Sequence, residues 1–262
     1  MTFEDDAVET LGFYPSYLAA VADEPRYAKL VWAQTERAVG EPAVRDAGER
    51  VARAAVPAVR ETVPDATPAA RGEQVDETVR FFSFVMFRLT FAMVFCRYAL
   101  GGRSTLAAHA EPVPMGEDVP PRIADGLDRS VPADPDITLV QPPDAEGRVR
   151  NLYDRLLAEL DTPNVNNVFR GLAFDPDLLA TVVDAQTGID AAERHALERR
   201  MRGWYAQAVA DAGLSVPDHR RLLRDRGLDH AAVDSVASRM RAFHENLPTL
   251  TTTVVLADLV SE

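Results

Sequence analysis

The segment from Pro163 to Leu179 carries the side chains with the most scope for chemistry. It reads PNVNNVFRGLAFDPDLL, so that three asparagines precede an arginine and two aspartates. A carboxylate can take a proton from a water molecule as that water attacks a substrate. A side-chain amide can orient the same water, because it both donates and accepts hydrogen bonds. These residue types therefore fit a hydrolytic site.

The same residues also fit a structural role. The run Asp175-Pro176-Asp177 is typical of a helix start, with an N-cap, a proline in the first turn and an acid facing the helix dipole. A carboxylate in that position has a lowered pKa, so a basic Asp177 would need an apolar surround. We expect caps at Asn164 or Asn167 and a ligand role for Asn166.

Two further side chains are candidates for binding a small acid. Arg88 interrupts an apolar stretch and could bind a carboxylate or a halide; alternatively, it pairs with an internal acid or lies on the wet edge of a helix. Trp32 could form a pocket wall, although aromatic residues at helical spacing usually belong to the core. For Arg170 we expect an ion pair with a nearby acid.

Several kinds of chemistry find no support in the sequence. The histidines show no metal-binding spacing and no nucleotide-binding glycine motif is present, so we expect neither a metal nor a cofactor. His195 and His219 lie among charged residues and are predicted to be exposed. Cys96 is the only cysteine, which excludes an internal disulfide and a CxxC redox pair, and we expect it to pack in the core.

Apolar residues recur at helical spacing along most of the chain, whereas strand-like alternation is confined to pieces such as Ile137 to Val140. Examples of the helical spacing begin at Val149, Leu178, Met201 and Val233. We therefore predict an all-α fold. The stretch from Phe81 to Leu100 is long enough to span a bilayer, but the arginine near its middle favours a buried core helix.

The organisation suggests one domain, 1–262, made of two similar halves. Residues 101–147 hold eight of the eighteen prolines and are predicted to form a long connector between repeats 1–100 and 148–262. The segment YLAAVADEPRYAKLVW matches VFRGLAFDPDLLATVV at an offset of 151 residues. Leu89-Thr90 and Leu250-Thr251 align at an offset of 161. We read these matches as a pseudo-symmetric internal duplication.

The run Val165-Asn166, Phe169-Arg170, Leu172-Ala173 and Pro176-Asp177 resembles the second repeat of the group I 2-haloacid dehalogenases. That family is all-helical, with two pseudo-repeats joined by a long loop. The resemblance implies that Asp177 activates a water molecule, which Asn166 holds, and that the water displaces halide with inversion of configuration. We expect Phe169 of this run to bind substrate, together with Trp32 and Arg88.

The duplication bears on the two proposed catalytic groups. At the offset of 151 residues, Asn166 corresponds to Pro15 and Asp177 corresponds to Arg26. The first half therefore lacks both polar groups. A site between two pseudo-symmetric halves would need its chemistry only once.

Charge and composition limit the partners. The formal net charge is −13 and Lys29 is the only lysine, a balance that argues against nucleic-acid binding and resembles adaptation to high salt. The acidic start of the chain lacks the pattern of a secretion signal, so we expect a cytoplasmic protein without a membrane partner.

The sequence therefore favours a cofactor-independent hydrolase that acts on short 2-haloalkanoic acids and yields 2-hydroxy acids. The alternative is a divergent helical protein that binds another small acid or serves as an interaction module. The family resemblance suggests a homodimer.

Overall fold

The computed structural model describes residues 2–11, 13–63, 72–101, 103–116, 118–129, 137–160, 162, 164–213 and 217–261, apart from the side chains of 103–105. Within these ranges the chain is helical and contains no strand, which confirms the all-α prediction. The elements are α1 (Phe3–Leu11), α2 (Ser16–Ala19), α3 (Pro25–Gly40), α4 (Pro42–Thr62), α5 (Glu73–Phe84), η1 (Val85–Leu89), α6 (Thr90–Gly101), α7 (Arg103–His109), α8 (Pro121–Asp128), η2 (Pro142–Asp144), α9 (Gly147–Glu159), α10 (Asn167–Leu172), α11 (Pro176–Gly188), α12 (Ala191–Asp211), α13 (His219–Asp225) and α14 (His230–Leu259).

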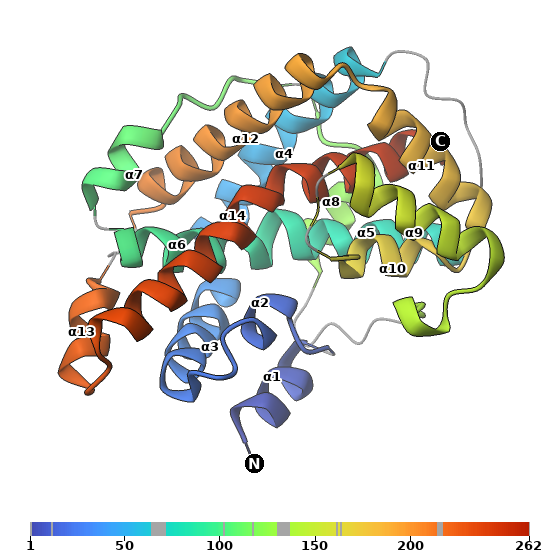
Figure 1. The fold of residues 1–262 in the computed structure, drawn as a ribbon. Helices are drawn as coiled ribbons and strands as arrows, with labels where there is room; N and C mark the ends of the chain where they lie inside the picture. Colours follow the sequence, from blue (N-terminus) through green and yellow to red (C-terminus); the bar gives the residue numbers. More distant parts are fainter. Residues whose placement is uncertain are drawn as a thin grey trace.

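Two long helical segments run through the middle of the molecule (Figure 1). One is the continuous stretch α5–η1–α6, and the other is α14, which packs against it. Helices α4 and α12 pack against each other and against α14. Helix α3 packs on α6, whereas α11 packs on α14. The two central segments therefore form the core layer against which the other helices pack.

The apolar stretch from Phe81 to Leu100 is a core helix, as predicted. The helical stretch Glu73–Gly101 is long and apolar enough to cross a membrane by composition, but 83% of its most apolar window is buried inside the fold. Its phenylalanines at 81, 82, 84, 87 and 91 are all at most 2% exposed. Burial of such large side chains supplies much of the hydrophobic stabilisation of the fold.

This central helix contains one π-helical turn, η1, whose widened backbone leaves carbonyl groups that need other donors. The Thr90 hydroxyl donates to the carbonyl of Val85 over 2.9 Å, and the Tyr205 hydroxyl donates to the carbonyl of Met86 over 2.9 Å. Side-chain hydroxyl groups of α6 and α12 thus donate hydrogen bonds to the carbonyl groups of this turn. Such turns often occur at functional sites.

The connector is more ordered than its proline content suggests. Within the described part of 101–147, it forms α7, α8 and η2. The prediction of a plain connector missed these helices because Pro121 and Pro142 stand in first turns, where proline is tolerated. Pro132 and Pro135 lie outside the described residues.

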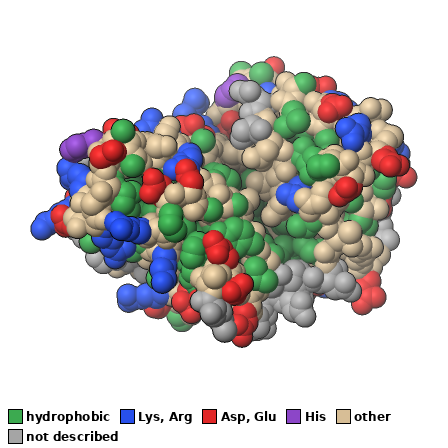
Figure 2. Space-filling view, turned by 60° about the horizontal axis from the view of Figure 1, so that its bottom comes forward, with side chains coloured by type: hydrophobic (Ala, Val, Ile, Leu, Met, Phe, Trp, Pro, Cys, Tyr) green, Lys and Arg blue, Asp and Glu red, His purple; other side chains and the backbone are tan. Residues whose placement is uncertain are grey.

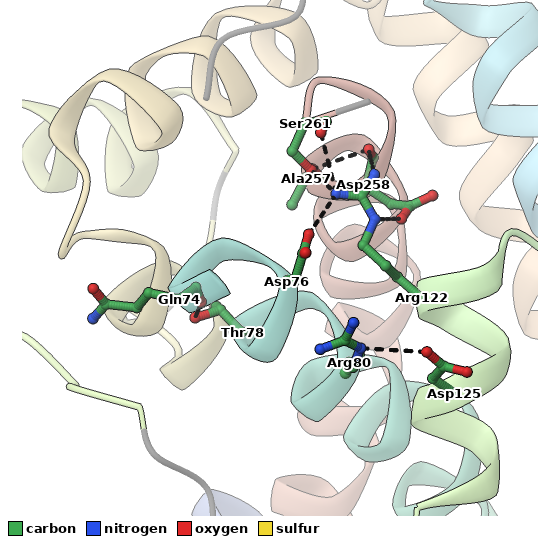
Figure 3. A network of polar contacts seen from close by, with 9 residues as sticks. All are labelled: Gln74, Asp76, Thr78, Arg80, Arg122, Asp125, Ala257, Asp258 and Ser261. Atoms are coloured by element: carbon green, nitrogen blue, oxygen red, sulfur yellow. Dashed lines mark hydrogen bonds and ion pairs between the residues drawn. The ribbon is translucent and has the colours of Figure 1, made fainter. Parts of the chain in front are cut away.

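One connector side chain joins the end of α14 to α5 and α8 (Figure 3). Arg122 forms an ion pair with the buried Asp258 carboxylate, 2.9 Å from Nε to Oδ1, and donates to the Asp258 carbonyl over 2.8 Å. The same guanidinium donates to the Ser261 hydroxyl over 2.8 Å and to Asp76 over 3.1 Å. A buried charge is tolerable only when it is paired in this way.

The order of helices repeats along the chain. Helices α2 and α3 begin 151 residues before α10 and α11, and α4 and α12 are each 21 residues long. The stretch Glu73–Gly101 has 29 residues and α14 has 30. The internal duplication and the division of the single domain into two repeats remain predictions, for which these boundaries provide support.

Candidate functional site

A cavity of about 160 Å³ lies between the starts of α2 and α10 and the two central helices. Its wall contains residues from both halves and from the connector. The lining residues are Phe13, Pro15, Ser16, Tyr17, Phe81, Phe82, Val85, Met86, Leu89, Thr90, Met93, Ile137, Leu139, Asn166, Asn167, Val168, Phe243, Leu247 and Leu250. The π-helical turn η1 contributes Val85, Met86 and Leu89, so the irregular part of the central helix faces this cavity.

Twelve of the nineteen lining positions form pairs at the two offsets found in the sequence. Residues 15–17 lie 151 positions before residues 166–168, and all six line the cavity. Three residues of the first central segment pair with three of α14 at the offset of 161, namely Phe82 with Phe243, Met86 with Leu247 and Leu89 with Leu250. The cavity therefore lies between the segments that the predicted duplication pairs with each other.

The polar atoms of the lining are few, and several already have partners. The Tyr17 hydroxyl lies 3.0 Å from the Thr35 hydroxyl, and the Thr90 hydroxyl is occupied by η1. Asn166 is 9% exposed and its Oδ1 accepts from the backbone N–H of Val168 over 3.3 Å. Asn166 is thus the N-cap of α10, which corrects the prediction of a cap at Asn164 or Asn167.

Asp177 lies outside this cavity lining. It occupies the first turn of α11, its side chain is 76% exposed, and its carboxylate forms an ion pair with Arg148 of α9. Asp175 caps α11 as predicted, with its Oδ1 accepting from the N–H groups of Asp177 and Leu178. In the described lining, Asn166 therefore has no carboxylate beside it, and the catalytic role of Asp177 remains a prediction.

The other predicted substrate contacts also lie outside the lining. Trp32 is 3% exposed and its indole Nε1–H donates to Asp6 over 2.6 Å. Phe169 is completely buried in the core. Neither residue belongs to the described wall of the cavity, so contact with substrate remains a prediction for both.

Arg88 bonds to backbone carbonyl groups and not to the internal acid of one structural alternative, and it is partly exposed, as the other alternative held. Its Nε donates to the carbonyl of Val39 over 2.9 Å, and its Nη1 donates to the carbonyls of Leu127 and Arg129 over 3.2 and 2.8 Å. Burial lowers the pKa of Arg88. The guanidinium thus ties η1 to the ends of α3 and α8, and its proposed contact with substrate remains a prediction.

Two further expectations were wrong. Arg170 donates to the side-chain oxygens of Asn167 and Gln141, which are amides and not acids. His219 is completely buried, and its ring meets Tyr27 edge-on with 5.8 Å between centroids. Burial lowers the pKa of His219 to about 4. The prediction of an exposed His219 relied on the charged residues beside it in the sequence. It failed because α13 turns its His219 side toward the core.

His195 and Cys96 lie where they were expected. His195 is exposed. Cys96 is completely buried on α6, with its thiol 3.8 Å from Oε1 of Gln34, and burial raises its pKa to about 12. Across the part of the chain that the structure describes, no three histidine, cysteine or acidic side chains are arranged to hold a metal ion.

Sequence reasoning missed most of the cavity wall. The apolar residues at 82, 86, 89, 243, 247 and 250 resemble ordinary core positions, because helical spacing alone does not distinguish a wall from a filled interior. The match of Leu89-Thr90 with Leu250-Thr251 was the available signal, since both pairs include residues at this site. Figure 2 shows hydrophobic side chains gathering toward the middle of one face, with charged side chains mostly around them.

No family model and no curated protein matches the chain. Solved structures do match over nearly its whole length, each covering 99% of this chain and 90% of the other. They are a D-2-haloacid dehalogenase mutant in complex with D-2-CPA (TM-score 0.68, 14% identity), a D-2-haloacid dehalogenase mutant (0.74, 13%) and a D-2-haloacid dehalogenase in complex with L-LA (0.65, 14%). The chain therefore has the fold of these structures.

Proposed function

On the fold shared with the D-2-haloacid dehalogenases, we propose that the chain is a cofactor-independent hydrolase of 2-haloacids. The observation that carries the proposal is the cavity between the two halves, which Asn166 lines. Small-molecule sites are concave and mostly apolar, with a few convergent polar groups, and this cavity has that composition.

The proposed reaction is a direct displacement. The oxygen of a water molecule forms a bond to the carbon bearing the halogen, the carbon–halogen bond breaks, and halide leaves with the bonding electrons. A carboxylate takes a proton from the water as it attacks, so the products are a 2-hydroxy acid and halide. Asn166 is suited to hold the water through its amide Nδ2, since its Oδ1 is engaged by the helix cap.

The base in this proposal is Asp177. Its ion pair with Arg148 must open and its carboxylate must turn toward the cavity before it can reach a water held by Asn166. The pair is exposed, and exposed ion pairs contribute little to stability, so opening it costs little.

A matched pair of variants tests the role of Asp177. Asp177→Asn removes the proposed base, whereas Asp184→Asn changes another exposed acid of α11, which forms an ion pair with Arg155 of α9. We expect the first variant to lose about 100-fold or more of halide release from 2-chloropropionate at high salt. The second should behave like the wild type.

Two results would contradict different parts of the proposal. Absence of halide release by the folded wild type would exclude the hydrolase. Equal rates for wild type and Asp177→Asn would retain the hydrolase but exclude Asp177 as its base.

A second candidate is a binding protein that keeps this fold without hydrolysis. The observation in its favour is that the described lining of the cavity contains no carboxylate, while Asp177 is exposed. Calorimetric binding of 2-chloropropionate without any halide release would favour this candidate over the enzyme.

A further inference from the structure

Two buried tyrosine–histidine pairs lie outside the cavity. Tyr27 meets His219 edge-on with 5.8 Å between ring centroids, and Tyr98 meets His244 edge-on with 5.6 Å. All four residues are at most 6% exposed. In each pair, the tyrosine hydroxyl and a ring nitrogen of the histidine have no hydrogen-bond partner among the described residues. Buried polar groups usually have partners, so these atoms are available to a bound molecule.

The charged groups around the two pairs differ. Burial lowers the pKa of both histidines, and at His219 the charge of Asp218 opposes that effect. The groups that add to the effect of burial at His244 are all basic, namely Arg97, Arg202 and His109. The surroundings of the Tyr98 pair are therefore the more positive, although the whole chain carries a formal charge of −13.

Three arginines near the Tyr98 pair have no carboxylate partner. Among the described residues, Arg97, Arg202 and Arg241 form no ion pair, and the Nε of Arg97 is buried without a hydrogen-bond partner. The Arg97 guanidinium lies 6.0 Å from the centroid of the Tyr98 ring. Burial and the charge of Arg241 lower the pKa of Arg97, and Glu245 opposes them only in part. A partly buried charge is normally paired, so an anion would stabilise this arrangement.

These side chains range from the core to the surface, and we call the six of them the Tyr98 cluster. Two members are buried, two are partly buried and two are exposed: Tyr98 and His244, Arg97 and Arg202, and His109 and Arg241. They lie on α6, α7, α12 and α14, which pack together. None of the six is in the described lining of the cavity. A small anion entering from solvent therefore meets cations first and a neutral hydroxyl at the base.

The residue types of the cluster indicate an oxyanion as the ligand. A guanidinium presents paired N–H groups whose spacing matches two oxygens of a carboxylate or a phosphate, and its charge strengthens those hydrogen bonds. A tyrosine hydroxyl adds a further donor. Chloride is a single atom, so it cannot offer a separate oxygen to each N–H group of the pair.

We propose that the Tyr98 cluster binds a small oxyanion, at a site separate from the cavity. The shared chemistry of its ligands is a pair of negatively charged oxygens, as in inorganic phosphate or a short carboxylic acid such as lactate. These oxygens accept hydrogen bonds from Arg97, Arg202 and the Tyr98 hydroxyl. The anion balances like charges on α6, α12 and α14, so its binding stabilises the packing of these helices. The site does not depend on the proposed hydrolase function.

Calorimetry at constant ionic strength tests the class of ligand. The full chain is titrated with inorganic phosphate, with lactate and with chloride. We expect at least one of the two oxyanions to bind about tenfold or more tightly than chloride, and the tighter of the two identifies the source of the oxyanion. Chloride binding as tight as that of both oxyanions would overturn the proposal, as would the absence of binding by either oxyanion.

Matched tyrosine variants link the binding to this cluster. Tyr98→Phe and Tyr27→Phe each remove a buried, unpartnered hydroxyl beside a histidine and leave the ring in place. Loss of a hydrogen bond to a charged ligand weakens binding about tenfold, so we expect that loss in Tyr98→Phe and none in Tyr27→Phe. Equal affinities of Tyr98→Phe and the wild type would place the anion elsewhere and overturn the proposal.

A matched pair of arginine variants adds a measurement of stability. Arg97→Gln removes a cation of the cluster, whereas Arg45→Gln removes one that forms an exposed ion pair with Asp128. Salts such as phosphate stabilise folded proteins in general, so the difference between the variants is the quantity measured. We expect the tighter oxyanion to raise the melting temperatures of the wild type and Arg45→Gln equally, and that of Arg97→Gln by less. An equal rise in all three proteins would contradict the proposal. If Arg97→Gln does not fold, Tyr98→Phe takes its place in this comparison.

Discussion

The segments at the starts of α2 and α10, 151 residues apart, both line the cavity but with different side chains. In the first half, Pro15 precedes α2 and has no amide hydrogen or polar side chain to offer. In the second half, Asn166 occupies the corresponding position, caps α10 and retains an amide group beside the cavity. Two helix starts of similar geometry thus contribute differently to the cavity wall. Asn166 provides a polar group, and Pro15 provides only an apolar surface.

A second pair of positions, also 151 residues apart, shows the same contrast in the core. Thr35 of α3 and Gln186 of α11 are both at most 1% exposed. Thr35 bonds to Tyr17 within its own half, whereas Gln186 donates to the Thr249 carbonyl and accepts from the Thr253 hydroxyl of α14. Thr35 therefore connects α3 to α2, whereas Gln186 connects α11 to α14.

The largest predicted effect contrasts the long helices α4 and α12. A Cβ atom at Gly48 of α4 would lie 1.8 Å from the backbone oxygen of Phe87, whereas at Gly203 of α12 it would lie 2.7 Å from the side chain of Glu111. The backbone of η1 is fixed inside its helix, whereas Glu111 lies outside any helix, although its Cβ is one of the atoms at 2.7 Å and its N–H donates to the Gly203 carbonyl over 3.1 Å. We expect Gly48→Ala to lower the free energy of unfolding by about 3 kcal/mol or more.

Gly203→Ala provides the comparison. It should lower the free energy of unfolding by about 1–2 kcal/mol, less than Gly48→Ala, because the Glu111 segment must shift to clear the new Cβ while the alanine improves helix propensity. Chemical denaturation measures both variants. Equal losses of unfolding free energy in the two variants would show that the contact of α4 with η1 is no more sensitive to an added Cβ than the contact of α12 with Glu111.

The next effect concerns pH, because buried histidines occur in the second half and residues 1–100 contain no histidine. Burial lowers the pKa of His219 to about 4, and burial with the charges of Arg97 and Arg202 lowers that of His244 to about 3. The unfolded state binds these protons near pH 6.5, before the folded state does. Stability is therefore full above pH 6.5 and falls as pH drops below it.

Each histidine should contribute a loss of about 2 kcal/mol between pH 6.5 and pH 5. Denaturation at several pH values measures this slope. His244→Phe should remove its share, while His195→Gln, at an exposed position, should not. An unchanged slope in His244→Phe would show that His244 is not neutral in the folded protein.

The smallest effect separates the two buried polar positions. Thr35→Val leaves the buried Tyr17 hydroxyl without a partner and should cost about 1–2 kcal/mol, part of which Tyr17→Phe recovers in the double variant. Gln186→Leu should cost less, since the Thr253 hydroxyl still donates to the Thr249 carbonyl over 2.8 Å. A double-mutant cycle by thermal unfolding measures the coupling, and its absence would remove this contrast between the halves.

The sequence was sufficient for the helical class, because apolar residues at helical spacing identify faces such as that of Leu178 and Leu179 directly. It also located the Asp175 cap, whose signal is local. It could not place Asp177 relative to Asn166, since the rotation of α11 about its axis depends on packing against α9 and α14. Likewise, Arg88 satisfies carbonyl groups from two distant segments, which local patterns do not encode.

The burial of Cys96 has a practical consequence. It is the only thiol in the chain, it sits on α6 in the core, and its raised pKa keeps it in the unreactive protonated form. A thiol reagent can therefore modify it only during moments when the central helix is uncovered. The rate at which a thiol reagent modifies Cys96 therefore measures how often the helices around α6 open locally.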